Sequence, residues 1–118
     1  YYKKFYPGRP PADLDAHLAR IFESMARPGH WKAFRRTASA GHVEAAARVG
    51  EVRKPTLVVM GEKDPDWTDP AAEAHWVADT LRGETLLVPG AGHYPMTEYP
   101  ETVNPAIVTF VDRVSARA

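Results

Sequence analysis

The sequence predicts a small mixed α/β structure in which two parallel strands are flanked by helices. Two short apolar runs without charges, 56–60 and 85–88, indicate strands that are buried on both faces. A helical pattern of apolar residues lies between them, and a second helical pattern follows them. Because strand, helix, strand and helix follow one another in this order, we expect parallel strands joined by a right-handed crossover.

The first half of the chain carries helical signals only. After a Pro- and Gly-rich loop over 7–11, apolar residues recur at helical spacing from Asp13, a candidate N-cap, to Met25. A second helix is predicted over 30–40 and a short Ala-rich helix over about 42–49. Several aromatic residues of this half could line a lid over an apolar substrate or serve only as packing: Tyr1, Tyr2, Phe5, Tyr6, Trp31 and Phe34.

The helices of the second half have clear start signals. Asp69-Pro70 places a capping carboxylate before a proline at the first helical position, and Gly83 is the expected end of that helix. Asn104-Pro105 repeats the start signal for the last helix. The two predicted apolar stripes are Ala74, Val77, Ala78 and Leu81, then Ile107, Phe110, Val111 and Val114.

Composition excludes several classes of function. The 118 residues suit one small domain, and 15 Lys+Arg balance 15 Asp+Glu, so we expect no nucleic-acid partner. No apolar run is long enough to cross a membrane. The absence of cysteine excludes disulfides and thiolate chemistry, and the five histidines form no i, i+4 pair. We therefore expect no metal, no cofactor and no membrane, and a cytoplasmic location.

The candidate site lies where the two strands end. The first strand runs into Gly61-Glu62-Lys63-Asp64, and the second runs into Pro89-Gly90-Ala91-Gly92-His93. In open parallel sheets functional groups gather at the carboxyl ends of the strands, so Asp64 and His93 are expected to meet there. A carboxylate that accepts from imidazole Nδ1–H fixes the tautomer needed for a general base.

Each of these residues has a structural alternative. Asp64 could be a turn residue and His93 an ordinary loop residue, but independent turn residues have no reason to occur on adjacent strand ends. Asp66 and Asp69 are competing acids, although Asp69 already has the role of helix cap. Trp67 and Tyr94 are candidate substrate-binding residues, with packing as the alternative for both.

These motifs resemble the C-terminal part of the α/β-hydrolase superfamily. The run Pro55–Asp64 is similar to its penultimate core strand and acid loop, and Pro89–His93 with Glu98 and Pro100 is similar to its last strand and histidine loop. The resemblance implies that Asp64 is the triad acid and His93 the triad histidine. It also implies two parts, a helical cap or lid segment over 1–52 and a portion of the hydrolase core over 53–118.

The sequence departs from the family at the nucleophile. Its serines, Ser24, Ser39 and Ser115, do not lie in a Gly-x-Ser-x-Gly elbow, and no His-Gly-Gly oxyanion segment occurs. In the family both precede the acid, and this chain begins with Tyr1 and has its first methionine at position 25. We therefore expect a portion of a longer hydrolase, inactive alone, whose nucleophile is a serine or an aspartate.

Two hypotheses about function follow. In the first, the parent protein cleaves an ester, amide or related bond in a small apolar substrate, with the nucleophile supplied by a missing N-terminal segment. In the second, the chain is a non-catalytic binding or assembly module, and its incomplete sheet is completed by a second copy or by a partner chain.

Overall fold

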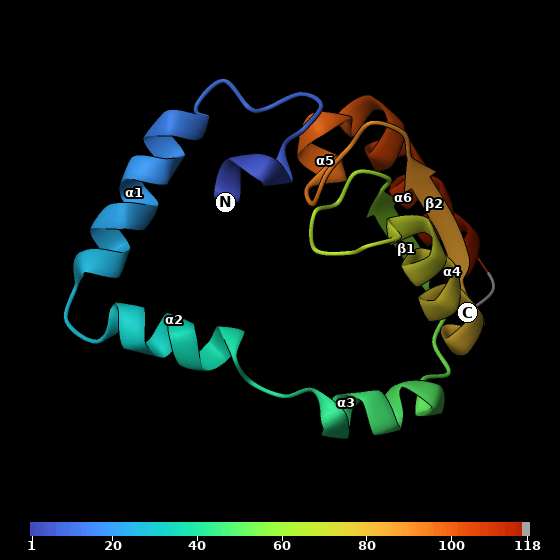
Figure 1. The fold of residues 1–118 in the computed structure, drawn as a ribbon. Helices are drawn as coiled ribbons and strands as arrows, with labels where there is room; N and C mark the ends of the chain where they lie inside the picture. Colours follow the sequence, from blue (N-terminus) through green and yellow to red (C-terminus); the bar gives the residue numbers. More distant parts are fainter. Residues whose placement is uncertain (117–118) are drawn as a thin grey trace. The chain divides into compact units, whose positions relative to one another are not determined.

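Figure 1 shows the computed structural model, which describes residues 1–116. The chain forms two compact units: one contains Tyr1–Pro10 and the chain from Val49 on, and the other contains Pro11–Arg48. The first ten residues were predicted to belong to the helical segment, but they belong with the sheet. Their attachment is direct, because the backbone N–H of His93 donates to the carbonyl of Phe5 at 3.0 Å.

The sheet of the first unit consists of two parallel strands, β1 (Leu57–Gly61) and β2 (Glu84–Val88). Their register pairs Val59 with Leu86 and Gly61 with Val88, so both strands end at the same edge. The predicted fold class is confirmed to this extent: the structure is mixed α/β, and its two strands pair in parallel around a helical crossover.

Two helices cover the sheet. Val103 of α6 (Pro100–Ser115) is fully buried in a cluster with Val88, and Val59 and Leu86 pack against that cluster. Because side chains alternate across a strand, the next residues along β1 and β2 point to the other face. There α4 (Pro70–Leu81) packs against both strands and buries Ala74 and Ala78 (Figure 1).

The start of α4 is as predicted, and its end is one residue off. The Asp69 carboxylate accepts from the backbone N–H of Ala72 at 2.9 Å, which confirms the cap. Arg82, not Gly83, takes the left-handed conformation after the helix, with φ of 52°. Gly83 instead donates its backbone N–H to the carbonyl of Ala78 at 2.8 Å, which closes the helix end.

The predicted start of the last helix at Asn104-Pro105 is wrong. A one-turn helix, α5 (Pro95–Glu98), follows the histidine loop, and α6 begins directly after it at Pro100. Pro95 and Pro100 both occupy the first turn of their helices, where the missing proline N–H would have no partner in any case. Pro105 lies inside α6, so the carbonyl one turn earlier, at Glu101, loses its usual helical donor.

Two short 3₁₀ segments, Tyr2–Phe5 and Val49–Glu51, complete this unit. The second of them contacts α4 at the entrance to the sheet. In residues 1–116, every helix is too short or too polar to span a membrane.

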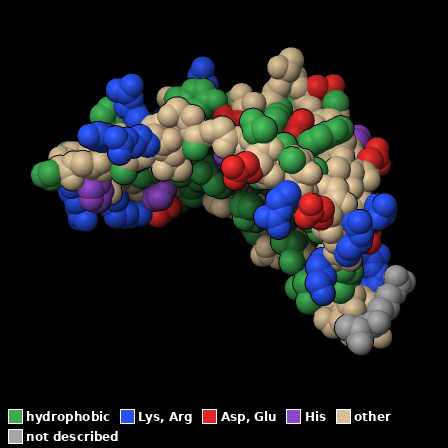
Figure 2. All heavy atoms as spheres, turned by 90° about the horizontal axis from the view of Figure 1, so that it is seen from below, with side chains coloured by type: hydrophobic (Ala, Val, Ile, Leu, Met, Phe, Trp, Pro, Cys, Tyr) green, Lys and Arg blue, Asp and Glu red, His purple; other side chains and the backbone are tan. Residues whose placement is uncertain are grey.

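The second unit contains α1 (Leu14–Ala26), α2 (His30–Ala38) and α3 (Val43–Arg48). Asp13 precedes α1 as expected, but its carboxylate lies 3.6 Å from Arg20 and does not cap the helix. Throughout residues 11–48 no side chain is fully buried, and Trp31 and Phe34 stack on each other while more than half exposed. Hydrophobic side chains also reach the surface among charged ones on the face drawn in Figure 2.

Gly61 is the position at which the sheet meets the histidine loop most closely. A Cβ atom at this residue would lie 2.0 Å from the carbonyl oxygen of Gly92 and 2.5 Å from that of Ala91. These neighbours are backbone atoms, which cannot swing away as a flexible side chain could. A glycine at the end of β1 is therefore required for the two loops to pack together.

Gly61→Ala should destabilise the chain by about 1–3 kcal/mol, the usual cost of overpacking a tight site. Chemical unfolding followed by circular dichroism measures the change. Gly50→Ala is the matched control, because nothing lies within 4 Å of an added Cβ there. Equal stability of the two variants would contradict the close approach at Gly61.

Candidate active site

Asp64 is placed by a turn that leaves the end of β1 and returns toward the histidine loop. The backbone N–H of Asp64 donates to the carbonyl of Gly61 at 3.1 Å. Before it, the N–H groups of Glu62 and Lys63 donate to the carbonyls of Val88 and Ala91 at 3.2 and 2.8 Å. The acid loop is thus hydrogen-bonded to the histidine loop through backbone atoms, independently of either side chain.

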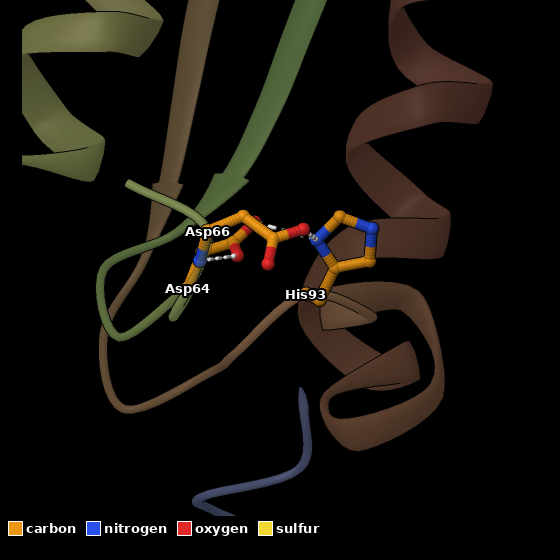
Figure 3. A group of neighbouring side chains, drawn as sticks. All are labelled: Asp64, Asp66 and His93. Carbon is orange, nitrogen blue, oxygen red and sulfur yellow. Dashed lines mark hydrogen bonds and ion pairs between the residues drawn. The ribbon is translucent and has the colours of Figure 1, made fainter. Parts of the chain in front are cut away.

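The side chains of Asp64 and His93 meet at this edge, as their position on adjacent strand ends predicted (Figure 3). Asp64 is 5% exposed, and its Oδ2 lies 2.9 Å from His93 Nδ1. Its other oxygen, Oδ1, accepts from the backbone N–H of Asp66 at 3.0 Å. Since a carboxylate only accepts, Nδ1–H of His93 is the donor, and of the two neutral tautomers this bond selects the one whose lone pair lies on Nε2.

The competing acids take other positions. Asp66 Oδ2 lies 3.5 Å from His93 Nδ1, farther than Asp64, and its Oδ1 accepts from the hydroxyl of Tyr1 at 2.7 Å. Asp69 caps α4. Figure 3 shows both Asp64 and Asp66 on the Nδ1 side of the imidazole ring, so Nε2 faces away from the carboxylates.

Aromatic rings flank the imidazole. The Phe5 ring lies 4.6 Å from the His93 ring at an interplanar angle of 31°, and Tyr94 meets it edge-on at 5.0 Å. Tyr6 in turn stacks on Tyr94 at 5.2 Å. Burial raises the pKa of Tyr94 to about 12, helped by a hydrogen bond with Tyr2 and by the nearby carboxylates. Burial, then Tyr2, also raises the pKa of Tyr6, so both phenols are neutral at pH 7.

The two candidate substrate-binding residues have different surroundings. Tyr94 belongs to the aromatic group around His93, together with Phe5 and Tyr6. Trp67 follows the Asp64 turn, its backbone N–H donating to the Asp64 carbonyl at 3.4 Å, and it is 44% exposed. The Trp67 indole, three residues from the acid, is exposed and accessible to a ligand. Tyr94 instead packs edge-on against the His93 ring.

Asp64, Asp66 and His93 are also the group in the described residues that could hold a metal ion, since one ligand atom from each lies within 4.8 Å of the others. Carboxylate oxygen and imidazole nitrogen are ligands for several divalent metals. The same Nδ1 atom that would bind the ion carries the proton that bonds to Asp64, however. Metal binding and the hydrogen-bonded pair are therefore mutually exclusive uses of these side chains.

Two residues at the site were not identified from sequence as parts of it. Phe5 was one of several aromatic residues with no assigned position, and no local pattern indicates that residues 1–10 return to the histidine loop. Glu98 entered only through the resemblance, yet it is 2% exposed and bonds to the backbone beside His93. The signal that the sequence offers for Glu98 is its place in the Glu98-x-Pro100 pattern of the resemblance.

Comparison with known proteins finds no family model, no curated protein and no solved structure that matches this chain.

Asp64→Asn should reverse the tautomer of His93. The amide NH₂ of asparagine can donate to Nδ1, which then loses its proton to Nε2, as expected for a triad whose acid is replaced. Long-range ¹H–¹⁵N spectra of the imidazole at neutral or higher pH distinguish the two tautomers.

Asp66→Asn is the matched control and should keep the Nδ1–H tautomer, because Asp66 lies farther from the ring. The opposite result, with the tautomer lost only in Asp66→Asn, would assign the acid to Asp66.

Proposed function

We propose that Asp64 and His93 are the acid and the base of an α/β-hydrolase active site. The observation that carries this proposal is the 2.9 Å hydrogen bond between a buried carboxylate and Nδ1 of a histidine at the common end of two parallel strands. The residue motifs around the pair, Gly61–Asp64 and Gly92-His93 with Glu98 and Pro100 downstream, support the same family.

In this proposal His93 takes the proton of the attacking group at Nε2 and later returns it to the leaving group. Asp64 holds the ring in the Nδ1–H tautomer and stabilises the imidazolium that forms. It can do so because it is buried and its second oxygen is already occupied by the N–H of Asp66. A carboxylate fixed in this way needs no rearrangement when the ring becomes charged.

The nucleophile, a serine or an aspartate, and the oxyanion hole would come from a segment other than these residues, because the sequence has no glycine-flanked elbow. The substrate would carry an ester, amide or related bond on a small apolar body. The aromatic group of Phe5, Tyr6 and Tyr94 beside the base supports this class. The chain has no cysteine, which is compatible with a reducing compartment, and we place the proposed enzyme in the cytosol.

To test this, the protein encoded by the complete reading frame is expressed, and its kcat for hydrolysis of short-chain p-nitrophenyl esters is measured. His93→Ala and Asp64→Asn should each lower kcat by about 10⁴-fold, since triad members act as a unit. Asp66→Asn, the matched control, should lower kcat by less than about tenfold, because Asp66 Oδ2 lies 3.5 Å from His93 Nδ1, farther than the 2.9 Å of Asp64.

Thermal unfolding of the same proteins serves as the fold control, because a half-exposed loop histidine contributes little to the core. A His93→Ala enzyme that is folded and keeps near-normal kcat on the p-nitrophenyl esters that the unaltered enzyme cleaves would contradict the proposal.

The second hypothesis, an assembly module, is favoured by apolar surface on the sheet unit. In the part of the chain that is described, β1 and β2 pair only with each other, which leaves an unpaired edge on each strand. On α6, three apolar residues are 40–57% exposed: Ile107, Val108 and Val111. Unpaired edges and apolar patches of this kind are sites where another chain binds.

The isolated 118-residue chain should therefore self-associate or retain a partner. Covering several hundred Å² of apolar surface is worth on the order of 10 kcal/mol at ~25 cal/mol per Å². Sedimentation equilibrium, with mass spectrometry for any co-purifying polypeptide, measures this. A dilute monomer that melts cooperatively without a partner would show that the unit is complete as it stands.

A further inference from the structure

Glu98 is a buried carboxylate, and its hydrogen bonds within residues 1–116 come from backbone N–H groups. It lies at the end of α5 and is 2% exposed. Its Oε1 accepts from Gly8 and Arg9 at 2.8 and 2.9 Å, and its Oε2 accepts from Gly92 at 2.5 Å. One side chain thus ties residues 8–9, near the start of the chain, to the residue that precedes His93.

The segment held in this way lies against the imidazole. The carbonyl of Phe5 accepts from the backbone N–H of His93 at 3.0 Å, and the Phe5 ring covers one face of the histidine ring. A Cβ at Gly92 would lie 2.3 Å from the Phe5 carbonyl oxygen and 2.4 Å from Cδ of Pro7, so the contact needs a glycine there. Figure 3 shows this N-terminal segment, in blue, passing beside the histidine loop.

In the proposed mechanism Asp64 orients the imidazole only through its bond to Nδ1. The carboxylate of Asp64 fixes the direction of Nδ1 but not the tilt of the ring about that hydrogen bond. The Phe5 ring, 4.6 Å away at an interplanar angle of 31°, restricts this tilt, and its position depends on where residues 5–9 are held. Glu98 holds this segment through two hydrogen bonds, from Gly8 and Arg9, and holds the histidine loop through a third, from Gly92.

We propose that Glu98 is a positioning residue for His93: it clamps residues 5–9 across the histidine loop, so that the imidazole is held between Asp64 and Phe5. The inference rests on the proposed role of His93 as the base. Glu98 does not touch the reacting atoms, and it acts through the backbone of Gly92 and the ring of Phe5.

A glutamine cannot replace Glu98 in this position. A carboxylate presents acceptors to N–H groups on both of its oxygens, whereas the NH₂ of an amide would face a backbone N–H on one side, donor against donor. Glu98→Gln therefore breaks either the bonds to Gly8 and Arg9 or the bond to Gly92 and changes the side-chain volume little.

Amide hydrogen exchange on the ¹⁵N-labelled full chain tests the clamp. Glu98→Gln should raise exchange at Gly8, Arg9, Gly92 and His93 by about tenfold or more, with the amides of β2 changed less than about twofold. The shift of the His93 Hε1 proton that is caused by the Phe5 ring should be lost at the same time.

Glu101→Gln is the matched control. It makes the same substitution three residues away, where the exposed carboxylate pairs with the Arg9 guanidinium of the same segment. Exposed pairs of this kind contribute little, so neither exchange nor the His93 shift should change.

Three outcomes would overturn the inference: no change in Glu98→Gln, an equal rise in exchange at all amides including β2, or the same local change in Glu101→Gln. If Glu98→Gln does not fold, Phe5→Ala decides instead. It should change the His93 shift while Gly8 and Arg9 stay protected, and an unchanged His93 shift would overturn the inference. None of these measurements uses catalysis, so an inactive enzyme would contradict only the proposed function.

Discussion

Parallel pairing of β1 with β2 is the constraint on which the candidate site depends. Parallel strands place their carboxyl ends at the same edge, so residues 29 positions apart in the chain meet as neighbours. The pairing continues past the strands, since Lys63 donates to the Ala91 carbonyl at 2.8 Å. Gly61 permits this approach because it carries no side chain. The separation of Asp64 and His93 is therefore set by backbone hydrogen bonds, and their own bond needs only to select the orientation of two side chains.

The two buried acids of the sheet unit act on the histidine loop in different ways. Asp64 binds the imidazole and one backbone N–H, whereas Glu98 binds three backbone N–H groups. A buried carboxylate is costly unless its oxygens accept hydrogen bonds, and here no oxygen of either acid is left without a donor. All the donors to Glu98 and one of the two donors to Asp64 are backbone N–H groups, and the other donor to Asp64 is the imidazole. These hydrogen bonds hold the glycine-rich histidine loop in one conformation. Without them the loop would sample several conformations, because glycine is conformationally permissive.

The sheet and the acid–histidine pair could be predicted from sequence because both depend on local signals. An apolar run between breakers indicates a buried strand, and the residues just past its end are then at the sheet edge. The prediction failed where two signals of the same kind compete, as when Pro100 and Pro105 both offer a helix start and the first one is used. It also failed for Phe5, whose position beside His93 results from contacts between segments almost 90 residues apart. Such contacts leave no periodicity in the sequence, and a single sequence cannot indicate them.

The arrangement separates the preparation of the base from the supply of the attacking group. Asp64, the backbone around Gly92 and the Phe5 ring, which together orient His93 in the proposal, belong to one compact unit. If the proposed function holds, a segment that brings the nucleophile would meet a histidine whose tautomer and tilt are already set. The entropy of ordering the base would then be lost when this unit folds and not during catalysis, which is the physical meaning of a preorganised site. The exposed apolar residues of α6 and the unpaired strand edges offer that segment a surface to pack against, because both would lose unfavourable exposure to water on contact.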